Sequence, residues 1–277
     1  MVTLGRFHYL EALPRGVSSL ASRPRGTAGE VQGTLVLIHG FPLSARTWEP
    51  QLGLADHGWR IIAPSLRGFD GTSPSTVATS IDDFAGDVID LLDALHIENA
   101  VIGGLSMGGY ITFAMFRHAP GYFRGMILAD TRAQADTPEG VEGRKKMIAA
   151  VREQGAAAAA EAMLPKLLCD VTRSNTPSVV EQIRAMILAN PTDTIVGAIT
   201  ALMSRPDATP LLSQIHCPTL VIVGEQDALT PPDLSRQIQQ GIRGAGLAII
   251  PDAGHMSNME QPVAFNDVLA RFLDRNV

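Results

Sequence analysis

Residues 100–113, AVIGGLSMGGYITF, change character halfway along and decide the fold. The first five residues are mostly apolar and predict a buried strand, whereas the residues from Tyr110 onward suit a helix. Between them lie four glycines and one hydroxyl, that of Ser106. Glycine permits a sharp turn from strand to helix. Such a turn does not require a serine at its apex, so Ser106 needs a chemical explanation.

Residues 104–108, GLSMG, match the G-x-S-x-G pattern of a nucleophile elbow. In an elbow the turn exposes the serine hydroxyl, and the helix N-terminus places backbone N–H groups near developing negative charge. The pattern alone is weak in glycine-rich sequences, but the strand–turn–helix setting makes it specific. The alternative is a serine that only caps the helix. We interpret Ser106 as a nucleophile.

The composition is that of a globular protein rather than a nucleic-acid or membrane protein. The 277 residues are 45% hydrophobic, enough for one large α/β domain or one domain with an insertion, and the net charge is −6. The sequence contains no run of about 18 apolar residues, so no transmembrane helix is expected. The N-terminus lacks the apolar region of a signal peptide. Cys169 and Cys217 predict two buried thiols in a reducing compartment. We therefore expect a cytoplasmic protein without metal or cofactor.

Six short apolar runs predict strands that are buried on both faces, as in a parallel sheet. They are TLVLIHG (34–40), WRIIAPS (59–65), AVIGGLS (100–106), GMILADT (125–131), TLVIVGEQD (219–227) and LAIIPDAGH (247–255).

Helical patterns lie between these runs. Residues 79–83 predict a helix start with a hydroxyl cap and acids in the first turn, and Pro262 can open a last helix at its first position. Strands that alternate with helices predict a doubly wound, mostly parallel α/β sheet. The first thirty residues predict an antiparallel edge hairpin followed by a loop.

One region breaks the alternation. Residues 132–210 contain helical patterns and no convincing strand, which predicts a helical insertion between two core strands. The expected core is then residues 1–131 and 211–277, with residues 132–210 as a separate helical unit.

A serine nucleophile needs a base, and the base needs an acid that orients it. His255 follows the last predicted strand, and Asp227 ends the strand before it, so both should reach the carboxyl edge of the sheet. Competing acids are Asp130, Glu225 and Asp252; for Asp130, which also ends a strand, we prefer the role of a loop or helix-capping carboxylate. His39 should hold the turn that follows it. The other histidines lack a comparable context: His8, His57, His96, His118 and His216.

Stabilising an oxyanion takes two donors. One should be the backbone N–H of Met107, the residue after the nucleophile. The other should come from the loop after the first core strand, and we expect the Phe41 N–H within HGFPLS. The side chains of Phe41 and Met107 would then line the pocket, although plain core packing is the alternative for Phe41.

These motifs together resemble the α/β-hydrolase fold superfamily over essentially the whole chain. HGFP (39–42), LRGFDGTS (66–73), GLSMGG (104–109), GEQD (224–227) and GHMSNMEQP (254–262) occur in the family's order. The resemblance implies that the helical insertion caps the active site. GLSMGG with GHMSNMEQP most resembles small carboxylesterases, enol-lactonases of aromatic catabolism and lactone-degrading relatives. SMGG (106–109) after HGFP is also similar to cofactor-free perhydrolases.

The same resemblance excludes some neighbours of the fold. Haloalkane dehalogenases and epoxide hydrolases use aspartate where this chain has Ser106, and proline-specific peptidases often have tryptophan where it has Leu105. Carbon–carbon hydrolases remain an alternative, although the arginine-rich version of loop 224–232 that they usually show is absent.

The insertion carries many medium-sized apolar side chains, most of which should pack against the core. A minority should form an adaptable wall suited to an acyl chain. Arg132 and Arg205 flank the insertion; they could recognise a carboxylate, but solvated surface positions are the preferred interpretation. The apolar residues are Met163, Leu164, Leu167, Leu168, Met186, Ile187, Ile195, Ile199, Leu202 and Met203.

The sequence therefore predicts a serine hydrolase of apolar carboxylic esters or lactones, with Ser106, His255 and Asp227 as its triad. Acyl-homoserine lactones fit because they join a lactone to an apolar chain. The alternatives are a perhydrolase that accepts peroxide in place of water, an enol-lactonase, and a hydrolase fold kept only as a ligand-binding module. The expected partner is a small ester or lactone, with no nucleic acid and no membrane.

Overall fold

The computed structural model describes residues 1–17, 31–72 and 77–277 of the chain. Eight strands form one sheet in the order β1-β2-β4-β3-β5-β6-β7-β8. β1 and β2 pair antiparallel with each other, and β2 pairs antiparallel with β4, whereas all other neighbours are parallel. The strands are β1 (Val2–Leu4), β2 (Phe7–Ala12), β3 (Gly33–Ile38), β4 (Trp59–Pro64), β5 (Ala100–Leu105), β6 (Phe123–Ala129), β7 (Thr219–Gly224) and β8 (Gly246–Ile250).

The sheet confirms the six strands that the apolar runs predict. Every residue of β4, β5 and β7 is buried, as expected of parallel strands covered on both faces. The predicted edge hairpin is β1 and β2. The loop expected after it falls largely on residues 18–30, outside the described residues.

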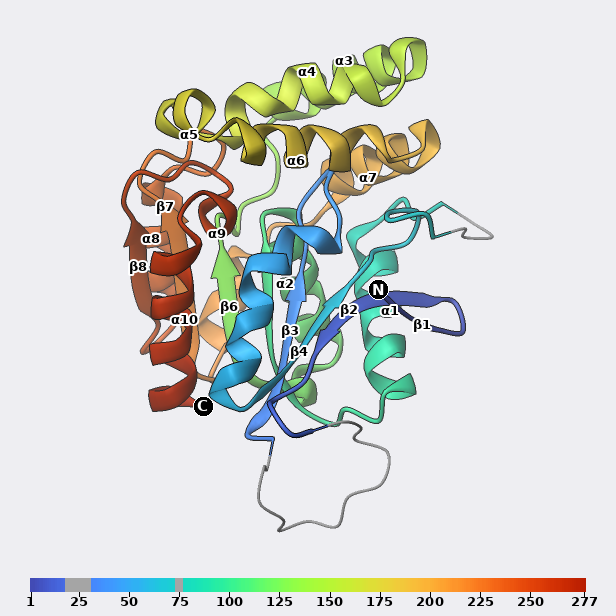
Figure 1. Cartoon of the computed structure of the whole chain (residues 1–277). Helices are drawn as coiled ribbons and strands as arrows, with labels where there is room; N and C mark the ends of the chain where they lie inside the picture. Colours follow the sequence, from blue (N-terminus) through green and yellow to red (C-terminus); the bar gives the residue numbers. More distant parts are fainter. Residues whose placement is uncertain (18–30, 73–76) are drawn as a thin grey trace.

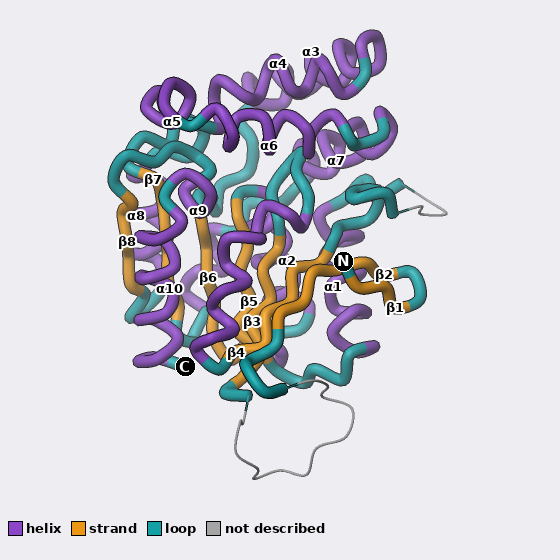
Figure 2. Tube along the Cα trace, viewed as in Figure 1, coloured by secondary structure: helices purple, strands orange, loops and turns teal. Residues whose placement is uncertain are grey.

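Helices cover both faces of the sheet, which confirms the doubly wound α/β architecture (Figures 1 and 2). η1 and α10 pack together on one face, while α1, α2 and α8 lie on the other. The helices of the core, outside the insertion, are η1 (Ala45–His57), α1 (Ile81–Ala94), α2 (Met107–His118), η2 (Pro120–Tyr122), η3 (Thr209–Gln214), α8 (Pro232–Gly241), α9 (Ser257–Glu260) and α10 (Pro262–Asn276).

Local capping signals place two of these helices as predicted. Ser80 caps α1: its hydroxyl accepts from the Asp83 N–H, and the Asp83 carboxylate accepts from the Ser80 N–H. This reciprocal pair satisfies two N–H groups that a helix start leaves unpaired. Pro262 is the first residue of α10, where its missing N–H costs nothing.

Five helices between β6 and β7 form the predicted helical insertion, here called the cap. Figure 1 shows them stacked beyond the carboxyl ends of the core strands. The Asn190 side chain donates to the Pro42 carbonyl at 2.8 Å, and the Thr194 hydroxyl donates to the Gly68 carbonyl at 3.2 Å. The cap is thus fastened to loops at that edge of the sheet. Its helices are α3 (Pro138–Gln154), α4 (Ala156–Leu167), α5 (Asp170–Asn175), α6 (Pro177–Leu188) and α7 (Thr192–Ser204).

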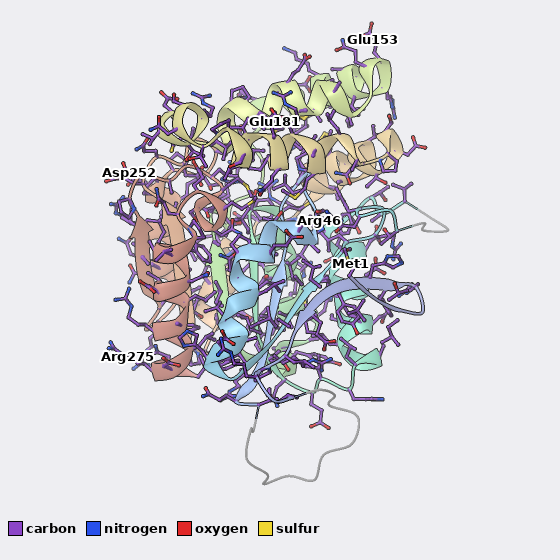
Figure 3. All side chains as sticks on the ribbon, in the orientation of Figure 1. Met1, Arg46, Glu153, Glu181, Asp252 and Arg275 are labelled. Atoms are coloured by element: carbon purple, nitrogen blue, oxygen red, sulfur yellow. The ribbon has the colours of Figure 1, made fainter. Side chains whose placement is uncertain are left out.

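The cap buries apolar side chains toward the core and exposes charge outward. Ile187, Ile195 and Ile199 are fully buried. Glu153, near the end of α3, is exposed and points away from the core (Figure 3). Across the described ranges no single helix is long and apolar enough to span a membrane; α6 and α7 pass only as a pair bent by 96°.

Candidate active site

Ser106 occupies a strained turn between β5 and α2. Its backbone has φ 57° and ψ −113°, a conformation that few residues other than glycine adopt. Its hydroxyl makes no capping hydrogen bond to the helix, so the capping interpretation fails. The Thr131 hydroxyl donates a hydrogen bond of 2.8 Å to the Ser106 carbonyl and so fixes it. The strand–turn–helix setting predicted for the elbow is therefore present.

Two glycines make this turn sterically possible. A Cβ on Gly104 would lie 2.0 Å from the Gly108 carbonyl carbon, and a Cβ on Gly108 would lie 2.1 Å from the Ile38 carbonyl oxygen. No side chain fits at such separations. The two glycines of G-x-S-x-G are therefore needed because the elbow packs closely, Gly104 against Gly108 and Gly108 against the end of β3.

Asp227 and His255 form a buried pair. His255 Nδ1 lies 2.8 Å from Asp227 Oδ2, and the two side chains are 2% and 0% exposed. Asp227 also accepts from the backbone N–H groups of Leu229 and Thr230 and from the Thr230 hydroxyl, at 2.8, 2.9 and 2.6 Å. These donors fix the carboxylate, which in turn fixes the imidazole ring with Nε2 facing away from it.

The pair's electrostatics favour an ion pair over two neutral groups. Burial would raise the pKa of Asp227, but attraction to His255 and hydrogen bonds from His255 and Thr230 outweigh it, so the pKa is lowered. Burial would lower the pKa of His255, but attraction to Asp227 and their hydrogen bond raise it above 6.5. Asp227 is therefore an anion placed to stabilise an imidazolium.

The three predicted triad residues lie at one edge of the sheet. Ser106 follows β5, Asp227 follows β7 and His255 follows β8, all parallel strands of the same sheet. Within the described ranges the Ser106 hydroxyl makes no hydrogen bond to His255. Such bonds are often long in a site without substrate. The geometry joins His255 to Asp227 directly and places Ser106 at the same edge.

The predicted oxyanion donors flank the elbow. Met107 is the first residue of α2, where helix N–H groups lack intrahelical partners. A Cβ on Gly40 would lie 3.2 Å from the Ser106 Cβ, so the loop that carries Phe41 passes close to the serine. In the described part of the chain neither the Phe41 nor the Met107 N–H donates to a protein acceptor. Both side chains are buried in the core cluster.

Asp130 is a second carboxyl group beneath the proposed triad, and it lies in the loop just after β6, as the loop interpretation expects, but it caps no helix among the described residues. It is fully buried at the end of β6, where Oδ1 accepts from the Gly224 N–H at 2.8 Å and Oδ2 accepts from the Ser257 hydroxyl. Burial and repulsion from Asp227 raise its pKa well above the ordinary value. Asp130 ties the end of β7 to the segment just after His255.

His39 holds the following turn, as expected. Its Nδ1 lies 3.0 Å from the Gly40 carbonyl, and its Nε2 accepts from the Leu66 N–H at 3.2 Å. Burial lowers its pKa, in keeping with a neutral structural imidazole.

The surface interpretation of Arg205 is wrong. Its side chain is 3% exposed, pairs with Asp136 at 2.9 Å and lies over the Tyr110 ring, 4.2 Å from the centroid. Asp136 also pairs with Arg132 and Arg144. Burial of Arg205 depends on Asp136, an acid of the cap that no local sequence pattern connects with it.

The prediction of two buried thiols is correct for Cys169, which is buried, and wrong for Cys217, which is only half-buried.

Within the described residues no group of three His, Cys, Asp or Glu side chains has the geometry of a metal site. The chemistry available at this edge of the sheet is that of a strained serine, a buried histidine–aspartate pair and two N–H groups without an acceptor among the described residues.

Comparison with known families agrees with this geometry. Residues 33–262 match the family model described as the alpha/beta hydrolase fold, and the chain belongs to this family.

Individual relatives match almost the entire chain. An esterase from Thermogutta terrifontis, solved with malate bound, is 34% identical with a TM-score of 0.88, covering 97% of this chain and 93% of its own. The enol-lactonase from Burkholderia xenovorans LB400 is 27% identical with a TM-score of 0.84, covering 97% and 96%. 3-Oxoadipate enol-lactonase 2 of Acinetobacter baylyi is 27% identical over 269 residues, covering 97% of this chain and 98% of its own.

Proposed function

We propose that this protein is a serine hydrolase that cleaves apolar carboxylic esters or lactones through an acyl-enzyme. The observation that carries the proposal is the buried Asp227–His255 pair at the same sheet edge as the strained, uncapped Ser106. A fold that only bound a ligand would not need this buried ion pair, whose desolvation is costly. The esterase and enol-lactonase relatives support the same reaction class.

Acylation begins with attack of the Ser106 hydroxyl oxygen on the substrate carbonyl carbon. His255 Nε2 takes the hydroxyl proton, and Asp227 stabilises the resulting imidazolium through Nδ1. The N–H groups of Phe41 and Met107 donate to the oxyanion of the tetrahedral intermediate. The intermediate collapses when the C–O bond to the alcohol breaks and the imidazolium returns its proton to that oxygen.

Deacylation repeats the sequence with water. His255 takes a proton from the water as it attacks the acyl carbon, and the bond to Ser106 breaks when the histidine protonates the serine oxygen. The products are a carboxylic acid and an alcohol; from a lactone they are one hydroxy acid. No step needs an oxidant, a reductant or a metal.

The composition of the cap supports the proposed substrate class. Leu164, Leu167 and Met186 are buried cap side chains of the adaptable apolar kind that accommodate acyl chains. Acyl-homoserine lactones combine such a chain with a lactone and are our specific candidates. Enol-lactones are the second candidate class, favoured by the two enol-lactonase relatives.

The test is a substrate panel read against the Ser106→Ala variant. It contains p-nitrophenyl esters of increasing chain length, acyl-homoserine lactones, an enol-lactone, and acetate with peroxide in a halogenation assay. Loss of turnover in Ser106→Ala supports the proposal, and the ranking identifies the preferred class. Full activity in Ser106→Ala, or ligand binding without turnover in the parent, contradicts it. Peroxide-dependent halogenation without ester turnover would favour the perhydrolase.

A further inference from the structure

Glu260, near the end of the motif GHMSNMEQP, has no role in the proposed chemistry, but its carboxylate accepts three hydrogen bonds from described residues. Its Oε1 accepts from the backbone N–H groups of Gly254 at 2.8 Å and Met256 at 3.2 Å. Its Oε2 accepts from the backbone N–H of Cys169 at 2.9 Å. Gly254 and Met256 are the two neighbours of His255. One carboxylate therefore holds the peptide groups on both sides of the proposed base and a third in the cap.

The cap segment at this point, residues 167–169, joins α4 to α5 and lies directly on the histidine loop. The Met256 N–H also donates to the Leu167 carbonyl at 3.1 Å. The Cys169 thiol donates to the Asp252 carbonyl at 3.5 Å. Figure 3 labels Asp252 at this corner, beside the cap helices. Most of the atoms in this contact between the cap and the histidine loop belong to the backbone. Unlike side chains, backbone groups cannot change rotamer to follow a shift of the cap.

Close packing makes this contact rigid. A Cβ on Gly254 would lie 2.7 Å from the Cys169 nitrogen and 3.0 Å from the Leu168 carbonyl carbon. Only glycine fits there. A shift of the cap segment would therefore displace the residue that precedes His255.

The charge of Glu260 is compensated by peptide N–H groups. Among the described residues no Lys, Arg or His forms an ion pair with it. Hydrogen bonds from N–H groups to a carboxylate are stronger than those between neutral groups. Burial would lower the pKa of His255 and Asp227 raises it most, but the Glu260 charge also contributes to the rise.

We propose that Glu260 is a positioning residue that couples the cap segment 167–169 to His255. Oε1 of Glu260 fixes the backbone N–H groups on both sides of His255. Because Oε2 binds the Cys169 N–H, the position of this backbone depends on the position of the cap segment. This role rests on the proposed function, because it presumes that His255 is the base.

The decisive variant is Glu260→Gln. A glutamine keeps the shape and one acceptor oxygen but replaces the other with an N–H donor. Whichever way the amide turns, either the Cys169 bond or the bonds from Gly254 and Met256 are lost. The matched control is Asp267→Asn, which removes an exposed carboxylate from α10. Gly254→Ala tests the same contact from the other side without changing any charge.

Three measurements read the effect on the full chain. One is kcat and KM for the best ester of the panel as a function of pH. Another is the titration of the His255 ring by NMR. The last is amide hydrogen exchange in residues 167–170 and 254–256, which needs no substrate. Circular dichroism checks that each variant is folded.

Glu260→Gln should lower kcat by about tenfold, because a misplacement of about 1 Å in a site costs up to ~100-fold. KM should change little. The His255 pKa should fall, and exchange should rise in one of the two segments. Asp267→Asn should change none of these. Gly254→Ala should lower kcat and raise exchange without the loss of negative charge.

The coupling is wrong if Glu260→Gln keeps kcat, the His255 pKa and exchange at parental values. Failure of the proposed function looks different: the parent would turn over no ester, or Ser106→Ala would remain active. In that case the exchange and titration measurements still decide whether Glu260 holds the loop to the cap.

Discussion

Two clusters of charged side chains, each built around a buried carboxyl group, differ in the sign of the charge that is in excess. Beneath the elbow, Asp130 and Asp227 share one cationic partner, His255. The two acids respond differently: the pKa of Asp227 is lowered by its direct bond to the histidine, while burial and the Asp227 charge raise that of Asp130. Where two acids lie near one histidine, the pKa values of the two carboxyl groups move in opposite directions.

The second cluster has the opposite excess. Where the chain enters and leaves the cap, Asp136 lies among Arg132, Arg144 and Arg205. Burial would raise the pKa of Asp136, but hydrogen bonds from Arg144 and Arg205 and their charges lower it to about 2. An excess of cations keeps this carboxylate ionised under nearly all conditions. The comparison teaches that the sign in excess decides whether a buried carboxyl group has a raised pKa, as in Asp130, or a lowered one, as in Asp136.

Ser106→Ala should have the largest effect. It sharpens the comparison because it removes the proposed nucleophile and leaves both clusters of charged side chains intact. Ester turnover should fall by roughly 10⁴-fold or more, as when a serine triad loses its nucleophile. Stability should change little, and the variant should no longer react with a fluorophosphonate label. A labelled Ser106→Ala protein, detected by mass spectrometry, would show that another residue is the nucleophile.

Asp227→Asn should have the next largest effect and breaks the first cluster at its ionised member. Loss of the anion favours the wrong histidine tautomer and should lower kcat by about 10⁴-fold. The pKa of His255 should fall because its main attraction is gone. In the parent, the raised pKa places the acid limb of kcat/KM above pH 6.5, since the neutral imidazole is the base. An unchanged acid limb in Asp227→Asn would mean that His255 does not control the rate.

Asp136→Asn breaks the second cluster and should act on stability rather than on chemistry. A folded pKa of about 2, against 3.8 for the free group, corresponds to about 2 kcal/mol of stability. Because the folded pKa is depressed, this contribution is complete above about pH 4 and is lost as the pH falls toward 2. Urea unfolding of parent and variant at pH 7 and pH 3 measures it. An equal loss at both pH values would contradict the assignment.

Much of the fold was predictable from sequence because its signals are local. The buried parallel strands appear as short apolar runs, and the elbow appears as glycines that leave no room for a Cβ at residues 104 and 108. The positions of the three proposed triad residues at one sheet edge were predictable because each stands at or after the end of such a run. Their catalytic roles stay predictions until turnover is measured.

The missed features depend on contacts between distant segments. Arg205 is buried only because Asp136, which lies 69 positions earlier, receives it. The partners of Glu260 are backbone N–H groups, which every residue type except proline has. The identity of the partner residues therefore could not predict these hydrogen bonds. A glutamate five positions after the predicted base was visible, but its three partners were not.

Asp130→Asn should have the smallest effect and tests whether the two acids of the first cluster really differ. If Asp130 is neutral, asparagine can replace it closely: its oxygen accepts from the Gly224 N–H, and its amide donates to the Ser257 hydroxyl. Then kcat should stay within about threefold, and the acid limb should not move, since no charge near His255 has been removed. Asp130→Ala is the matched variant that removes the bridge itself. It leaves two buried polar groups unpaired, at roughly 1–3 kcal/mol each.

The sign of any pH shift decides between the two states of Asp130. An ionised Asp130 would help to hold the proton on His255, so Asp130→Asn would move the acid limb to lower pH. A neutral Asp130 contributes position only, so Asp130→Ala would lower stability while Asp130→Asn would not. A downward shift in Asp130→Asn would therefore show that both acids act electrostatically on the histidine. Asp130 and Asp227 would then both be charged, and they would differ only in that Asp227 contacts His255 directly.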